Sequence, residues 1–249
     1  MTITGNSLAD LQQLSAEDLI RWAVREHGSR FAVVTSFQSE GMVLLDMAAR
    51  VSADVRVITL DTGRLPPETY DMMEMIRQHY RTRIEIVSPD ASEAERMVTR
   101  FGPNLFYESL AHRRLCCEIR KVRPLARKVV GVDAYAVGLR RGQGEAREGV
   151  AKAALDDRKL KLSPLADWTR EQVAAYTKEH DVPVHPLYAQ GYTSIGCGPC
   201  TRATQPGQNE RAGRWWWEEG GNSECGLHFT AEGKVERSVD VLLREILTS

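Results

Sequence analysis

No part of this 249-residue chain carries a long apolar run, and none approaches the roughly eighteen consecutive apolar residues of a membrane span. The opening residues lack a basic region followed by an apolar one, so no secretory signal is predicted. An excess of charge of one sign is also missing, because 33 Lys and Arg balance 34 Asp and Glu to a net charge of −1. We therefore expect a cytoplasmic protein without a general attraction to membranes or nucleic acid.

Repeats, low-complexity tracts and linkers are absent too, and short apolar segments alternate with segments of helical pattern. The predicted strands are 31–36, 55–60, 83–87 and 134–139. The predicted helices are about 7–27, 42–49, 66–79, 91–101, 116–130, 169–180 and 239–246. This alternation is typical of an α/β fold with a mainly parallel sheet flanked by helices.

Polar residues follow three of the predicted strands directly. They are Ser36–Ser39, Asp61–Gly63 and Gly138–Arg141. Ligands of such folds bind at the carboxyl ends of the strands, so these three segments are expected to line one cleft.

Cysteine is scarce, and the five residues form two pairs and one single. Cys116 and Cys117 are adjacent, and Cys197 and Cys200 form a C-x-x-C pair. Structural zinc usually takes spaced pairs, whereas adjacent thiolates can bind different irons of a larger cluster. The spacing therefore favours iron–sulfur over zinc. A thioredoxin-like dithiol fits less well, because that motif should open a helix early in a compact domain.

The fifth cysteine, Cys225, lies in the sequence SECGLH near the end of the chain. An isolated cysteine is usually a small core residue. Here its neighbours are polar and turn-prone, and His228 is close enough to help hold a thiolate or an anion. A reactive nucleophile is the favoured interpretation.

Three motifs in order carry a family resemblance: CCxxRKxxPL, SxGCxxCT and ECGLH. With them the chain resembles the assimilatory adenylyl-sulfate (APS) reductases over roughly residues 31–228. The resemblance implies a PP-loop (adenine nucleotide alpha hydrolase-like) fold and Cys225 as nucleophile. It also implies one [4Fe–4S] cluster per chain on Cys116, Cys117, Cys197 and Cys200. Where PP-loop ATPases carry SGGxDS this chain has SFQSEG at 36–41, so ATP hydrolysis is not expected.

The resemblance also suggests roles for the residues around the substrate. Lys121 matches the family lysine between cluster and substrate, and Arg211, Arg214 and His228 match its sulfate-binding positions. Arg140 or Arg141 is expected to meet the phosphate. The residues expected to hold adenosine and phosphate are Ser36, Ser39, Leu60, Asp61, Thr62 and Gly63.

The implied reaction converts APS to sulfite and AMP with electrons from reduced thioredoxin, in assimilatory sulfate reduction and cysteine biosynthesis. An S-sulfocysteine on Cys225 is the expected intermediate. We expect one domain over 1–249, with a core to about 205 and a catalytic tail from about 206. Assembly into a homo-oligomer is compatible with the sequence.

Three alternatives remain open at this point. The first is reduction of 3′-phosphoadenylyl sulfate (PAPS), or of both nucleotides. The second is a PP-loop tRNA-thiolating enzyme, which should carry SGGxDS and a basic RNA-binding face. The third is a non-enzymatic metal scaffold or redox sensor, which leaves the ECGLH motif unexplained.

Overall fold

The computed structural model describes residues 7–156, 158–218 and 234–248. Within these residues one sheet has six strands in the order β3-β2-β1-β4-β6-β5. The strands are β1 (Phe31–Val34), β2 (Arg56–Leu60), β3 (Ile84–Val87), β4 (Ala134–Val137), β5 (Ala153–Asp156) and β6 (Lys159–Leu162). All neighbours are parallel except β5, which runs antiparallel to β6. The predicted mainly parallel α/β sheet is confirmed.

The helices differ from the prediction mostly at their ends. They are α1 (Leu8–Gln13), α2 (Ala16–His27), α3 (Ser39–Val51), α4 (Pro67–His79), α5 (Ala91–Phe101), α6 (Leu110–Cys117), α7 (Arg123–Val129), α8 (Arg170–Glu179) and α9 (Lys234–Thr248). The single opening helix that we predicted is two helices. The first ends at Gln13, where Leu14 turns to extended backbone, and Ser15 caps the second, because its side chain accepts from the N–H of Asp18 at 3.0 Å.

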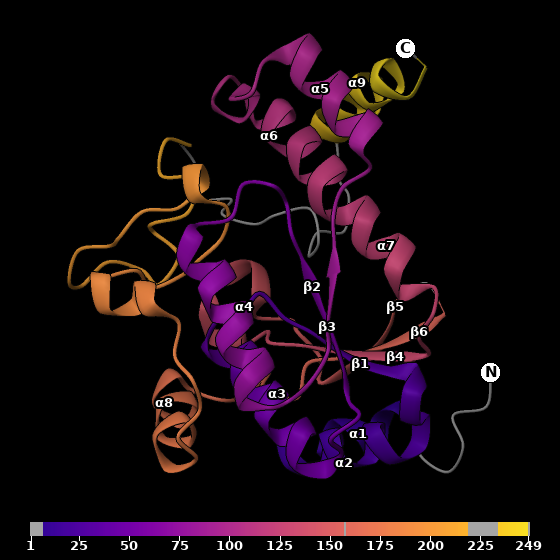
Figure 1. The fold of residues 1–249 in the computed structure, drawn as a ribbon, viewed down its shortest axis with the longest axis vertical. Helices are drawn as coiled ribbons and strands as arrows, with labels where there is room; N and C mark the ends of the chain where they lie inside the picture. Colours follow the sequence, from indigo (N-terminus) through magenta and orange to yellow (C-terminus); the bar gives the residue numbers. More distant parts are fainter. Residues whose placement is uncertain (1–6, 157, 219–233, 249) are drawn as a thin grey trace.

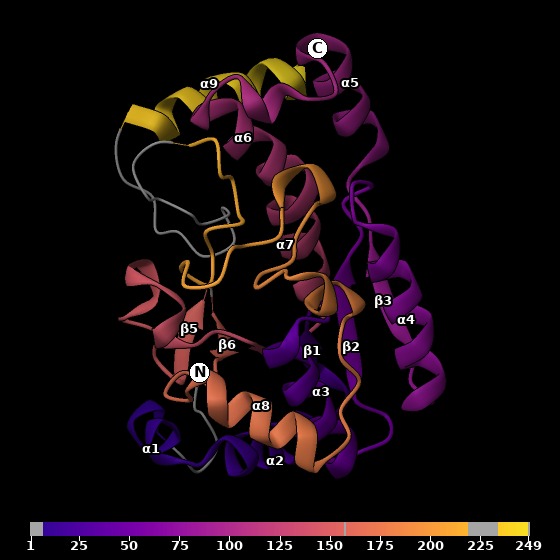
Figure 2. The ribbon, with the colours of Figure 1, turned by 90° about the vertical axis from the view of Figure 1, so that its left-hand side faces the viewer.

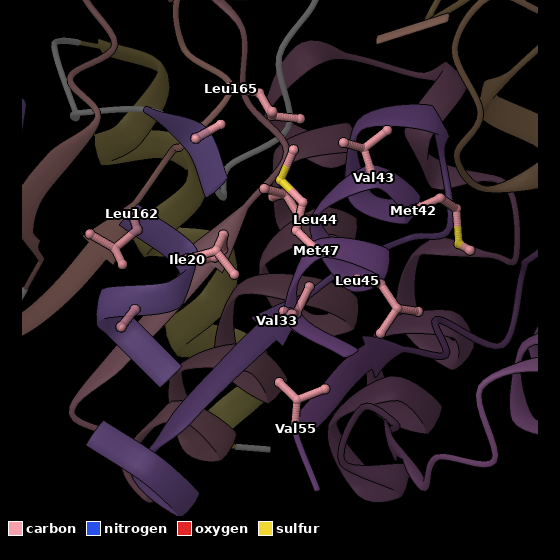
Figure 3. Packing of buried hydrophobic residues seen from close by; sticks show 14 of the residues in the cluster. Ile20, Val33, Met42, Val43, Leu44, Leu45, Met47, Val55, Leu162 and Leu165 are labelled. Atoms are coloured by element: carbon pink, nitrogen blue, oxygen red, sulfur yellow. The ribbon is translucent and has the colours of Figure 1, made fainter. Parts of the chain in front are cut away.

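The two faces of the sheet are covered by different helices. On one face, inward residues of the strands such as Val33 and Leu162 pack against Ile20 of α2 and Leu44 and Met47 of α3 (Figure 3). On the other face, the alternate residues of β1, β2 and β4 form a second cluster with Val129 of α7. Helix α3 begins directly after β1, at the carboxyl edge of the sheet, and this is the edge at which ligands bind in such folds.

The helical run around the adjacent cysteines begins earlier than predicted and contains a wide turn. Residues Glu118–Val122 form a π-helical segment between α6 and α7. Pro124 follows this segment, and a proline cannot donate the usual bond to the carbonyl four residues earlier. A π turn before it accommodates that loss, and such turns often occur at functional sites. Lys121 lies within this turn.

Helices α5, α6 and α9 gather at one end of the molecule, away from α2, α3 and α8 (Figures 1 and 2). Their cluster includes Leu115 and Ile119 from the cysteine-bearing run and Ile246 from α9. The run from α6 to α7 joins this helical group to the sheet (Figure 1). Among the described residues, no helix is long and apolar enough to cross a membrane.

Candidate active site

A large cavity opens at the carboxyl ends of β1, β2 and β4. It holds about 1280 Å³ of space free of protein atoms, part of it open to solvent. The predicted residues that line it are Ser36, Leu60, Thr62, Lys121, Cys197, Arg211 and Arg214. Gly138 and Leu139, which directly follow β4, line it as well, so all three predicted strand ends do meet in one cleft. The space is large enough for a nucleotide.

The loop between β1 and α3 forms one wall of this cavity. Thr35 Oγ1 accepts from the N–H of Phe37 at 2.9 Å, and Phe37 has a positive φ of 59°. A Cβ on Gly41 would collide with the same Thr35 hydroxyl. The first turn of α3 therefore packs tightly against the loop that forms the cavity wall. The first N–H groups of a helix have no partners inside the helix. Such a helix start is suited to an anion.

Gly138 is fixed by a second close approach. A Cβ there would lie 2.8 Å from Glu40 Cβ and 2.9 Å from Gly41 N. The end of β4 can therefore touch the start of α3 only because this position is glycine.

Arg214 lines the cavity, and its guanidinium has few hydrogen bonds to other described residues. Its side chain is buried, and among the described residues its Nη1 makes two long hydrogen bonds of 3.4 Å, to Ser194 Oγ and the Ile195 carbonyl. Its buried Nε has no hydrogen-bond partner among the described residues. Buried polar groups are nearly always paired, so this one is a candidate for binding a ligand. Arg211 lines the same cavity.

Five other predicted contacts lie outside the cavity lining. Arg140 is buried in ion pairs, while exposed Arg141 donates from Nε to the Val150 carbonyl at 2.9 Å. Ser39 donates its N–H to Tyr188 Oη at 3.2 Å. Asp61 accepts from the N–H of Gly63, the remaining predicted position. A substrate contact stays a prediction for each of them.

A second, smaller cavity lies among the four paired cysteines. It encloses about 350 Å³ free of atoms, part of it open, and Cys116, Cys117, Cys197 and Cys200 all line it. The basic residues around it are Arg64, Arg113, Arg120 and Lys121. Among the described side chains, no three His, Cys, Asp or Glu are arranged to hold one metal ion.

The thiols in this cavity are electrostatically unequal. Burial, together with neighbouring cysteines, raises the pKa of Cys116 and of Cys200 to about 12. Burial acts the same way on Cys197, but Lys121, Thr62 and Arg214 outweigh it and hold its pKa below the ordinary value. Thiols that are buried and crowded resist ionisation. Positive charge close by, from side chains or from bound metal, stabilises their thiolate form.

The two cavities share a wall. Lys121 and Cys197 line both of them. Lys121 hydrogen-bonds the Cys197 sulfur, and Thr62 Oγ1 lies 3.2 Å from the same atom. Lys121 therefore lies between the cysteines and the large cavity, and its role toward a substrate stays a prediction.

Cys225 and His228 lie outside the described residues. The segment just before them is anchored on the cysteine-bearing helix, because buried Arg113 forms an ion pair with Glu218. Arg113 also stacks on buried Trp215 with its Cζ 4.3 Å from the ring centre. Trp215 packs as a core residue.

Sequence reasoning missed several residues that line the large cavity. They are Gln143, Arg147, Lys161 and Glu210. Gln143 and Arg147 follow the end of β4 within a turn-rich stretch, and Arg147 hydrogen-bonds Gln143. Their nearness to a strand end was an available signal. Lys161 had none, since β6 itself was not predicted.

Comparison with known proteins identifies the family. A sequence profile for the phosphoadenosine phosphosulfate reductase domain matches residues 30–203. This chain belongs to that family. Proteins named adenosine 5′-phosphosulfate reductase are similar to it along most of their length. The one from Allochromatium vinosum is 43% identical over 87% of this chain and 85% of its own. The Burkholderia cepacia protein is 42% identical over 86% of both chains.

Solved structures agree on the fold. The phosphoadenylyl-sulfate reductase of Candida auris, in a phosphate complex, is 27% identical with a TM-score of 0.67. The match covers 81% of this chain and 99% of that one. Yeast FAD synthetase has a TM-score of 0.51 at 13% identity, over 79% of this chain and 72% of its own, which is a likeness of fold alone.

Proposed function

We propose that this protein reduces adenylyl sulfate to sulfite and AMP in sulfate assimilation. The observation that carries the proposal is Lys121, which lines both a basic cavity of nucleotide size and the cavity of the four thiols. Relatives more than 40% identical over most of this chain bear the name of that activity. The core to about residue 205 and the segment after it would act as one catalytic unit.

The four paired cysteines fit a [4Fe–4S] cluster better than a single ion. A cubane takes one thiolate per iron, so its ligands surround a space instead of meeting at one point. Cys116, Cys117, Cys197 and Cys200 are arranged around a cavity in that way, and the four basic side chains there offset thiolate charge. When bound, the cluster would supply a fixed centre of negative charge. Lys121 would lie between this centre and the substrate and would interact with both.

In the proposed reaction, the Cys225 thiolate attacks the sulfate sulfur of APS. The bond from that sulfur to the bridging oxygen breaks, AMP leaves with the oxygen, and Cys225 carries a sulfonate. A thiolate of reduced thioredoxin then attacks the Cys225 sulfur and releases sulfite. The second thioredoxin thiol resolves the mixed disulfide, which leaves Cys225 reduced and thioredoxin oxidised.

The cavity supplies the positive charge that this reaction needs, because an anionic nucleophile approaches an anionic sulfate. Lys121, Arg211 and Arg214 are the proposed sulfate ligands, with His228 assisting at the tail. The under-bonded guanidinium of Arg214 supports its part of this role. Ser36, Thr62 and the start of α3 would hold adenosine and phosphate.

The test is a single turnover with ³⁵S-labelled APS and no reductant. The Cys225 peptide should gain label and one sulfonate mass, and reduced thioredoxin should release that label as sulfite. Cys225→Ser should bind APS and form no labelled protein. Sulfite formation by the serine variant at the native rate would overturn the proposal.

Reduction of PAPS is a second candidate, because the family and the Candida auris neighbour are named for that nucleotide. The ratio of kcat/KM for APS and PAPS on one preparation decides between them. A ratio in favour of PAPS would replace our choice of substrate.

A further inference from the structure

Two carboxylates line the cavity that we assign to a strongly anionic substrate. Glu40 comes from the first turn of α3, and Glu210 precedes Arg211 in the C-terminal segment. Negative charge in such a place opposes anion binding by simple Coulomb repulsion. Their presence therefore needs a reason other than contact with substrate.

Arg140 joins these two carboxylates. Its Nε donates to Glu40 Oε1 at 2.7 Å, and its Nη2 donates to both oxygens of Glu210 at 2.9 and 3.0 Å. The Arg140 side chain is only 2% exposed. The three groups form one buried bridge between segments that are 170 positions apart in the sequence.

Both ends of the bridge are otherwise held tightly. The Thr193 hydroxyl donates to the Glu210 carbonyl at 2.7 Å, so the backbone and the side chain of Glu210 are both fixed. Arg211 is the next residue. At the other end, Gly138 leaves no room between the end of β4 and Glu40. Movement of either segment relative to the other would break charged hydrogen bonds inside the protein.

We propose that Arg140 is a positioning residue, which holds the segment bearing Arg211 and Arg214 against the anion-facing start of α3. The two halves of the anion site then face one another at a fixed distance. This inference rests on the proposed function, since it assigns the cavity to APS. It differs from the sequence expectation that Arg140 or Arg141 contacts the phosphate directly.

The two roles predict effects of opposite sign when Glu210 loses its charge. If Arg140 were a direct ligand restrained by Glu210, Glu210→Gln would release a cation and tighten APS binding. If Arg140 positions the C-terminal segment, Glu210→Gln loosens that segment and weakens APS binding. AMP lacks the sulfate that Arg211 and Arg214 would hold, so its binding should change little.

The experiment measures dissociation constants of APS and AMP by calorimetry, in a Cys225→Ser background that prevents turnover. We expect Glu210→Gln to weaken APS binding about tenfold and AMP binding less than threefold. Glu210→Asp, which keeps the charge, should recover part of the loss. Glu145→Gln removes one exposed carboxylate of the neighbouring 3₁₀ turn and serves as the control for net charge.

Tighter APS binding in Glu210→Gln would overturn the proposal in favour of direct contact. Equal losses for APS and AMP, or an equal effect in the control, would also overturn it. Failure of the proposed function looks different, because the Cys225→Ser parent itself would then bind APS no better than AMP.

Discussion

Removal of the Lys121 charge should slow sulfonate transfer to Cys225 by about two orders of magnitude. Lys121 lies in the wall between the two cavities and hydrogen-bonds the Cys197 sulfur. Two unit charges that are about 4–5 Å apart, at an effective dielectric constant near 20, interact by about 3–4 kcal/mol. Mutagenesis of comparable preorganised groups gives about 3 kcal/mol, which corresponds to roughly 150-fold in rate.

The substitution of choice is Lys121→Met, because methionine keeps most of the length of the side chain and removes the charge. The assay is single-turnover transfer of ³⁵S from APS to protein, at saturating APS and without reductant. Lys128→Met is the matched control on the same helical run. Lys128 pairs with Glu85 at 2.6 Å and lines neither the substrate cavity nor the thiol cavity.

The expected result is a large fall in the transfer rate for Lys121→Met and less than a twofold change for Lys128→Met. Iron content and the melting temperature are measured on both variants, so that loss of cluster or fold is not mistaken for loss of catalysis. A transfer rate within threefold of the native one, with native iron content, would refute the electrostatic role of Lys121.

Three further outcomes are expected. Gly41→Ala should lower the free energy of unfolding by about 1–3 kcal/mol in urea, because the added Cβ would displace the Thr35 hydroxyl, and this cost outweighs the helix preference of alanine. Gly149→Ala is the control and should be neutral, because the space around Gly149 is open. Burial lowers the pKa of His185, so the unfolded chain binds more protons and the free energy of unfolding should fall as pH drops below about 6.5; an equally steep fall in His185→Gln would contradict this. Purified protein should contain four irons per chain and Cys197→Ser fewer, whereas one zinc ion by elemental analysis would rule out the cluster.

Local patterns in the sequence were sufficient for the parallel part of the sheet. Apolar runs bounded by polar turns marked β1 to β4 to within two residues, because buried strands leave that signal without help from distant residues. The predicted helix 91–101 coincides with α5, whose Asp90 cap accepts from the N–H of Glu93. The hairpin of β5 and β6 was missed, although Lys159–Leu162 alternates polar and apolar residues as a half-buried strand does.

The cysteine pairs show both the strength and the limit of motif reasoning. Their spacing predicted that all four would surround one site, and the structure brings them to one cavity. It did not predict the π turn at Glu118–Val122, because the preference for a wide turn depends on how Pro124 and its neighbours pack in three dimensions. That turn sets where Lys121 lies between the thiols and the cleft.

Arg140 illustrates why charges were harder to place than sulfurs. A strand-end arginine beside a predicted anion site suggests a ligand, and no local pattern distinguishes it from an arginine that is already neutralised. The partners that decide its role come from α3 and from the segment before Arg211, so they become visible only when the chain is folded. A buried guanidinium with two carboxylates has little charge left to offer a substrate. Arg214 is the opposite case, since its fold partners leave its Nε unsatisfied among the described residues, and that deficit is what a bound sulfate would correct.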